Sequence, residues 1–194
     1  MLAVSLTAAP PAAPAPSLDV LRQALDPNPG LATYAAATSL SAVLHAGIAV
    51  HETFEGTAYY RKPVLKVEFR NVPPEFKRFS ELDTSLPTYE EVLRDYQAAP
   101  PADDGTTYSV VLTPNKRDGR VQSLTLRVDD ATRLVSQAAW AYKSGESLVM
   151  SPAYATNAEY HVFSTLAITA RFDAYNVDGT LRFSDYRLNV SVPI

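Results

Sequence analysis

Hydrophobic side chains recur at every second position over most of this chain, which is typical of strands with one apolar and one polar face. Between residues 65 and 69 the alternation is regular, with Leu65, Val67 and Phe69 separated by charged residues. From residue 108 onward the bulky residues stand at even positions: Tyr108, Val110, Leu112, Leu124, Leu126, Val128, Leu134, Trp140, Tyr142, Leu148, Met150, Tyr154, Tyr160, Val162, Leu166, Ile168 and Phe172. The pattern predicts a sheet that is apolar on one face.

Residues 34–50 show the same alternation and predict one or two further strands. The bulky residues there are Tyr34, Leu40, Leu44, Ile48 and Val50. Turn residues punctuate the later runs, and antiparallel hairpins are expected there. These turn pairs are Asp118-Gly119, Asp129-Asp130, Ser144-Gly145 and Asp178-Gly179.

In the last run the bulky residues move from odd to even positions. Leu181 and Phe183 stand at odd positions, whereas Tyr186, Leu188 and Val190 stand at even positions. A β-bulge near Ser184-Asp185 would account for this change. The whole pattern predicts a mainly β protein of about 8–10 antiparallel strands.

Two short segments have helical spacing instead. Residues 18–25 are amphipathic, with Ser17 as the expected N-cap. Residues 88–97 begin with a capping box formed by Thr88 and Glu91. Because a helix between β blocks must lay its apolar side on the sheet, it is either a cover for the sheet or a plain packing helix. Its apolar side carries Tyr89, Val92, Leu93 and Tyr96.

Residues 1–17 have no strand or helix periodicity and are rich in Ala and Pro. Their apolar start and the Ala-Pro-Ala at residues 13–15 predict the rear part of a secretory signal, and a disordered Ala/Pro arm is the alternative. We expect residues 18–194 to form a single domain, since 194 residues is the usual size for one.

The composition and the absence of known motifs exclude several classes of function. A net charge of −4 gives no basic footprint for nucleic acid. The absence of Cys removes disulfides, thiol nucleophiles and thiolate metal sites. No G-x-S-x-G elbow, Gly-rich phosphate loop or H-E-x-x-H motif is present, and the sequence therefore predicts a protein that is not an enzyme and needs no cofactor.

The densest group of metal-ligating residue types comprises His45, His51, Glu52 and Glu55. His45, His51 and Glu55 share a strand parity opposite to the apolar positions, so we expect them to face water rather than to bind metal. The acidic pairs Asp103-Asp104 and Asp129-Asp130 are interpreted as turn residues.

The apolar face of so many strands exceeds what two short helices can cover, and such a surface favours binding of a hydrophobic ligand. The alternative is a sheet that closes on its own side chains. The expected cavity wall consists of Leu65, Val67, Phe69, Leu124, Leu126, Trp140, Tyr142, Met150, Tyr160, Leu166, Ile168 and Phe172.

The order of elements resembles the outer-membrane lipoprotein-sorting (LolA-like) family. The segment from Gly56 to Pro73 carries the likeness, with a G-x-x-x-Y-x-K/R-P element at Gly56, Tyr60, Arg61, Lys62 and Pro63 before the alternating strand. The resemblance implies an open antiparallel half-barrel with short covering helices. It also implies that lipid or the acyl chains of lipoproteins are the ligand, in the periplasm or outside the cell.

Two functions follow from this resemblance. The first is a non-catalytic carrier that exchanges acyl chains with a membrane-bound donor or acceptor. The second is a lipid-sensing regulatory or protein-interaction module on the same fold.

Deleting residues 2–16 should leave the melting temperature unchanged, because a segment without periodicity and rich in Pro adds no strand to a sheet. Differential scanning calorimetry of the full and shortened chains measures this. A fall of more than a few degrees would show that the arm packs on the domain.

Overall fold

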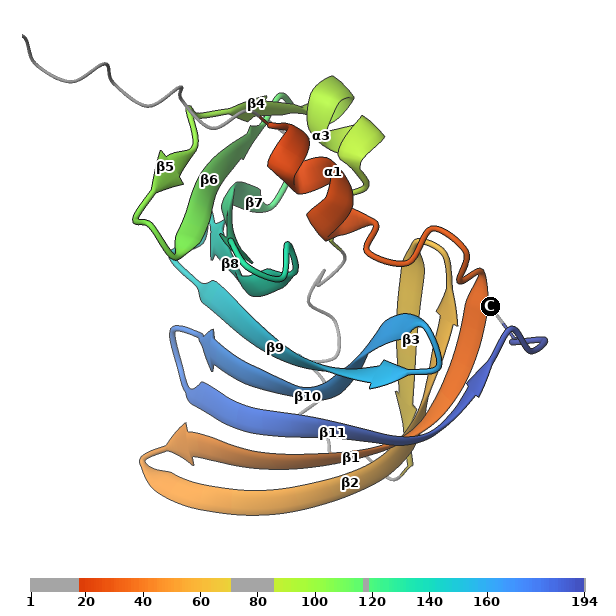
Figure 1. Cartoon of the computed structure of the whole chain (residues 1–194). Coiled ribbons are helices and arrows are strands. Elements are labelled where there is room, and N and C mark those ends of the chain that lie inside the picture. Colours follow the sequence, from red (N-terminus) through yellow and green to blue (C-terminus); the bar gives the residue numbers. More distant parts are fainter. Residues whose placement is uncertain (1–17, 71–85, 117–118, 194) are drawn as a thin grey trace, which may run out of the picture.

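The computed structural model describes residues 18–70, 86–116 and 119–193. These residues form one antiparallel sheet in the order β3-β2-β1-β11-β10-β9-β8-β7-β6-β4, with β5 paired to β6. The sheet curves into an incomplete barrel whose end strands β3 and β4 do not pair with each other (Figure 1). The predicted antiparallel half-barrel is confirmed.

The described residues contain eleven strands and two helices. The helices are α1 (Asp19–Leu25) and α3 (Tyr89–Asp95). The strands are β1 (Thr33–Ala46), β2 (Ile48–Arg61), β3 (Val64–Phe69), β4 (Tyr96–Ala98), β5 (Ala102–Asp103), β6 (Thr107–Pro114), β7 (Val121–Asp129), β8 (Val135–Tyr142), β9 (Ser147–Asn157), β10 (Tyr160–Arg171) and β11 (Asn176–Leu188).

The two short strands β4 and β5 lie in a Pro-rich segment from which the sequence predicted no strand. They extend the sheet beyond β6, where Tyr96 pairs with Pro114 and Ala102 pairs with Ser109. Strands of two or three residues have too few positions to show an alternation, so pattern analysis misses them.

Three of the four predicted turns can be compared with described residues, since Asp118 lies outside them. Gly145 has φ +88° between β8 and β9, and Asp129 starts the β7–β8 turn by accepting hydrogen bonds from Thr132. The predicted turn at Asp178-Gly179 is wrong, because both residues lie inside β11. Gly179 pairs with Ala42, and a Cβ there would come within 3.3 Å of Leu40, so this glycine serves a close approach between strands.

The register of the described strands shifts at four places, two of them between β7 and β8. The other two involve β10 and β11. Asp185 has φ +51° where the β1–β11 register shifts, which confirms the bulge predicted near Ser184-Asp185. A second shift, between Phe163 and Thr165, leaves Ser164 as an extra residue in β10. Because side chains alternate with a period of two, each extra residue exchanges the faces of the residues that follow it.

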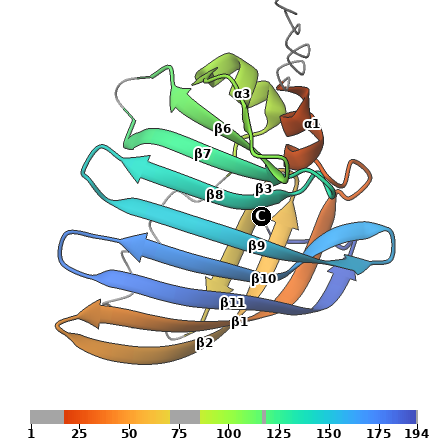
Figure 2. The same cartoon turned by 60° about the vertical axis from the view of Figure 1, so that its left-hand side comes forward.

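Both helices cover one end of the sheet, above β6, β7 and β8 (Figure 2). The capping box of α3 is confirmed, with Thr88 Oγ1 accepting from Glu91 N and Glu91 Oε2 accepting from Thr88 N. The helix ends at Asp95 rather than residue 97, because Tyr96 already belongs to β4. In α1 the N-cap position is held by Leu18 without a side-chain hydrogen bond, and the predicted cap Ser17 lies outside the described residues.

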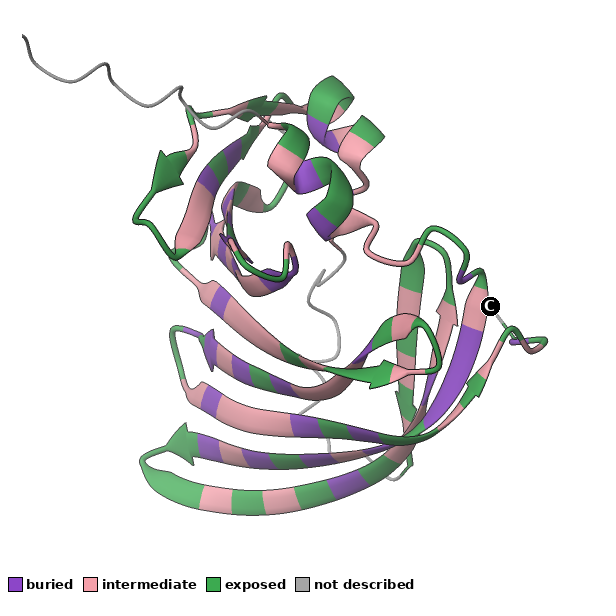
Figure 3. Cartoon of the chain, viewed as in Figure 1, coloured by how far each residue is buried: buried purple, intermediate pink, exposed green. Residues whose placement is uncertain are grey.

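Buried and exposed positions alternate along the strands, as predicted (Figure 3). Tyr34, Leu40 and Leu44 of the first block are buried, but Ile48 is 74% exposed, so its prediction as part of the apolar face is wrong. Ile48 follows Gly47, whose φ of +81° makes the β1–β2 turn, and it pairs with Ala46 at the tip of this hairpin.

Gly56 lies where β2 approaches both of its neighbours, and a Cβ there would be 2.5 Å from the carbonyl oxygen of Glu68 and 2.9 Å from the ring of Phe69. Gly56→Ala should therefore lower the free energy of unfolding by about 1–3 kcal/mol through overpacking. Urea titration measures this. Gly119→Ala is the matched control, because nothing lies within 4 Å of its added methyl group, and equal effects of the two substitutions would contradict the argument.

Candidate functional site

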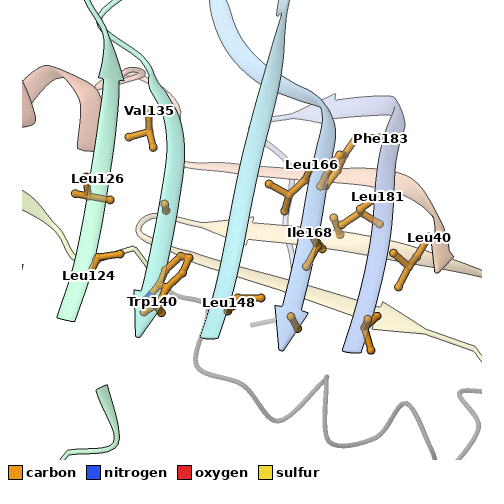
Figure 4. Close-up of a cluster of buried hydrophobic side chains, with 14 of the residues drawn as sticks. Leu40, Leu124, Leu126, Val135, Trp140, Leu148, Leu166, Ile168, Leu181 and Phe183 are labelled. Carbon is orange, nitrogen blue, oxygen red and sulfur yellow. The ribbon is translucent and has the colours of Figure 1, made fainter. Parts of the chain in front are cut away.

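The alternate apolar positions of the strands come together on the concave face of the sheet. Figure 4 shows side chains from β7, β8, β9, β10, β11 and β1 lying along this face, from Leu126 through Trp140 and Leu148 to Ile168, Leu181 and Leu40. All of them belong to one hydrophobic cluster that also includes residues of α1 and α3. The concave face is the candidate site.

Every residue predicted for the cavity wall lies in this cluster or packs against it. Leu124, Leu126, Trp140, Tyr142, Leu166, Ile168 and Phe172 are buried, whereas Leu65, Val67, Phe69, Met150 and Tyr160 are partly exposed. The structure thus brings the predicted residues together. Their binding of a ligand remains a prediction.

The predicted cover residues do not all face the sheet. Val92 of α3 is 1% exposed, and Tyr89 and Tyr96 pack against the cluster. Leu93 is 57% exposed, so its prediction as a cover residue is wrong. In a helix of only seven residues Val92 occupies the centre of the buried face, and the next residue is turned by about 100° away from it.

Several contacts fix α3 in place. The guanidinium of Arg22 lies 4.8 Å from the ring centroid of Tyr89, which joins α3 to α1. At the other end Asn115 donates from its side chain to the carbonyl oxygen of Arg94 and from its backbone to that of Asp95. These contacts at both ends favour the packing-helix alternative over a free cover.

Coverage of the concave face is uneven. Beneath the helices, Val110, Leu112, Leu124 and Leu126 are at most 1% exposed. At the other side of the sheet Phe54 and Ala58 of β2 are buried, but most of the apolar side chains of β2 and β3 on this face are only partly buried. These are Val50, Tyr60, Leu65, Val67 and Phe69. The protein itself fills the first region, and accessible apolar surface is found in the second.

An aromatic group that the sequence analysis did not assign to the wall lies between these regions. Tyr34 stacks on Tyr60 with ring centroids 4.9 Å apart and meets Tyr186 edge-on at 5.2 Å. Phe163 contacts Tyr154 at 5.3 Å and Phe183 at 5.7 Å. The extra residue Ser164 turns Phe163 to this face, and no even-odd count could have indicated that.

Burial changes the acidity of these tyrosines. Desolvation, with smaller contributions from Tyr186, Tyr60 and Tyr154, raises the pKa of Tyr34 well above its ordinary value. Burial likewise raises the pKa of Tyr154 and of Tyr186, whose hydroxyl groups donate to the backbone carbonyls of Val135 and Phe163. These phenols therefore stay neutral, and their hydroxyl groups are uncharged polar groups on an otherwise apolar face.

The opposite, convex face carries the residues considered for metal binding. His45, His51 and Glu55 are exposed, as predicted. His45 Nε2 lies 3.3 Å from Asp178, whose carboxylate also accepts hydrogen bonds from Thr169 and Arg171. Across the three described segments no group of three or more metal-ligating side chains converges.

The acidic pairs predicted to be turn residues lie where turns begin, since Asp103 and Asp129 are the last residues of β5 and β7. Asp104 accepts hydrogen bonds from the backbone and hydroxyl groups of both Thr106 and Thr107, and these bonds lower the pKa of its carboxyl group. Asp129 is held by Thr132 in the same way. Their side chains are engaged in turn structure.

Solved structures show which known proteins share this arrangement. An outer membrane lipoprotein-sorting protein domain from Vibrio parahaemolyticus superposes with a TM-score of 0.59 and 12% identity, over 91% of this chain and 93% of that chain. The chain has the LolA-like fold. A LolA superfamily protein from Nitrosomonas europaea (TM-score 0.55, 11% identity, 90% and 94% coverage) and a DUF1329 family protein from Desulfovibrio piger (0.55, 11%, 91% and 93%) share it.

Sequence comparison adds nothing to this LolA-like likeness, since no protein-family model and no curated protein matches the chain. Within the described segments, no helix has the length and apolar character required to cross a membrane.

The buried phenols of the LolA-like concave face predict a loss of stability at high pH. Above about pH 10 the unfolded chain releases the Tyr34 proton while the folded chain retains it, so folding becomes less favourable by up to about 1.4 kcal/mol per pH unit for this group. Tyr34→Phe keeps the ring and removes this proton. Urea unfolding at pH 7 and pH 11 should show a smaller drop for Tyr34→Phe than for the natural chain, and equal drops would contradict the prediction.

Proposed function

We propose that this protein binds lipid or the acyl chains of lipoproteins on the concave face of its half-barrel, and that it carries them without covalent chemistry. One observation carries the proposal. Five apolar side chains of β2 and β3 lie on the concave side and are only partly buried, although Phe54 and Ala58 of β2 are buried and the residues named above beneath α1 and α3 are at most 1% exposed. The five are Val50, Tyr60, Leu65, Val67 and Phe69. An apolar surface of this kind gains free energy when a hydrophobic ligand covers it.

The chemistry of an acyl chain suits this surface. Burying each CH₂ group contributes about 0.8 kcal/mol and needs no hydrogen-bonding partner. The nearby phenols of Tyr154 and Tyr186 already donate to backbone carbonyl oxygens, so they present ring surface rather than unused donors. Affinity would then depend mainly on the length of chain that is covered.

Two further points support carriage in a cell envelope. One neighbour of the same fold is described as lipoprotein-sorting, and the Ala/Pro-rich start of the chain has the pattern of a secretory signal. We therefore place the protein in the periplasm or outside the cell, where a membrane-bound donor or acceptor would exchange the ligand with it.

Native mass spectrometry of the full chain after mild purification tests the proposal. A stoichiometric mass that tandem spectrometry identifies as lipid or a lipid-modified peptide is the expected result. A co-purifying protein without lipid would instead favour the interaction-module function. A chain that takes up no added lysophospholipid would contradict carriage.

Val67 and Lys66 offer a matched pair of positions on one strand, because they point to opposite faces of β3. Val67→Gln should weaken binding of a fluorescent acyl probe by about fivefold or more, since it removes apolar contact at the accessible surface. Lys66→Gln should leave binding unchanged. Equal affinities for the two variants, at similar melting temperatures, would place the acyl chain elsewhere.

A further inference from the structure

The sheet is split between β10 and β11. These strands pair from Arg171 and Asn176 only as far as Thr165 and Arg182. Beyond that point residues 160–163 of β10 pair with β9 alone, and residues 183, 184, 187 and 188 of β11 pair with β1 alone. Figure 1 shows the two strands diverging, and each carries a bulge where they part, at Ser164 and Asp185.

Side chains rather than backbone bonds bridge this split. At its wide end Asn28, in the loop that follows α1, holds the edge of β10: it donates to the carbonyl oxygen of His161 (2.6 Å) and accepts from its N–H group (2.8 Å). Further in, the Tyr186 hydroxyl donates to the carbonyl oxygen of Phe163 (2.6 Å). The split is thus a window in the wall, bounded by two strand edges and by the loop that follows α1.

The window is unsuited to an added peptide strand. A peptide would need free backbone groups in register along one edge. Asn28 already bonds the backbone N–H and carbonyl groups of His161, and Tyr186 bonds the carbonyl group of Phe163. In addition, bulges of the kind found at Ser164 and Asp185 protect strand edges against pairing. A ligand that needs no backbone hydrogen bonds fits better.

A hollow of about 500 Å³ lies where the strands part. Polar and charged side chains contribute to its lining together with apolar ones, and it reaches Phe183 of the concave cluster. The other lining residues are Ala37, Thr38, Ser39, Glu55, Ser164, Thr165, Arg182 and Ser184. Arg182 and Ser39 are cross-strand neighbours, as are Ser39 and Glu55, so the two charges stand on either side of one serine. Neither forms an ion pair within 4 Å with any residue that the structure describes.

We propose that this hollow holds the polar headgroup of the bound lipid, with its acyl chain passing the window onto the concave face. The inference rests on the function proposed above. Arg182 would contact a phosphate and Glu55 an amine, so a headgroup that carries both charges, as in an ethanolamine phospholipid, is the expected class. The Tyr186 phenol, hydrogen-bonded to the opposite edge, must move for the chain to pass.

Because the chain has no Cys, single cysteines can block the window selectively. Ser184→Cys places a thiol in the lining of the hollow, and Ala167→Cys places one on exposed β10 outside the window. After coupling to a polyethylene glycol maleimide, displacement of a fluorescent acyl probe by lysophosphatidylethanolamine should slow several-fold for Ser184→Cys and not for Ala167→Cys. Equal rates at equal melting temperatures would overturn the window.

Headgroup selection is tested with three ligands that have the same acyl chain: lysophosphatidylethanolamine, lysophosphatidylglycerol and monoacylglycerol. Arg182→Gln should lower the affinity for both phospholipids by about two- to fivefold. Glu55→Gln should lower the affinity for lysophosphatidylethanolamine alone, by about the same factor. Monoacylglycerol should bind the natural chain and both variants equally. Unchanged affinities throughout would show that the headgroup lies elsewhere.

The two proposals fail separately. If no form binds any of the three ligands, carriage itself is wrong. If all forms bind them with the same rates and affinities, carriage stands and the window proposal is overturned.

Discussion

The pairing of β1 with β11 is the contact on which the rest of the structure depends. It joins the first strand of the sheet to the last strand in sequence, and through it the β1–β2–β3 unit is attached to the meander from β6 to β11. Gly179 allows the two backbones to approach closely opposite Ala42. Without this pairing Tyr34 and Tyr186 would not meet, and the half-barrel would divide into two unconnected sheets.

Because the sheet is open, its concave face must be covered by something other than itself. Two helices of seven residues bury Leu124 and Leu126 on the β6–β8 side and leave Val67 on the far side only partly buried. Short helices on a long sheet thus divide the interior into a filled part and an accessible part. The LolA-like fold provides the accessible part without any loss of core packing in the filled part.

Sequence alone gave access to the parts of this structure that repeat regularly. Alternation identified the concave positions of β3, β7, β8 and β9, and the phase change at Asp185 revealed one bulge because bulky residues stand on both sides of it. The bulge at Ser164 stayed hidden, since Val162 and Phe163 are both bulky and either parity fitted. The turn predicted at Gly179 was wrong because glycine occurs both in turns and where two strands approach closely, and the sequence does not distinguish the two.

The site shows the same division. The wall positions could be named from alternation, but the window between β10 and β11 could not, because it arises from which strands fail to pair. Asn28 and His161 are 133 residues apart in sequence, and no local pattern connects them. Leu93 shows how far burial can be predicted in a short helix, because adjacent residues point in different directions and a shift of one residue decides which side chain is buried.

The two ends of the sheet bear on how the molecule behaves at high concentration. Among the described residues β3 has a partner only in β2, and its outward positions carry the ion pair of Lys66 with Glu68. At the other end β4 is three residues long and is followed by Pro100 and Pro101. Charged pairs and prolines discourage a second molecule from adding its strands to such edges, so a protein with accessible apolar surface on its concave face can still avoid polymerising into fibres.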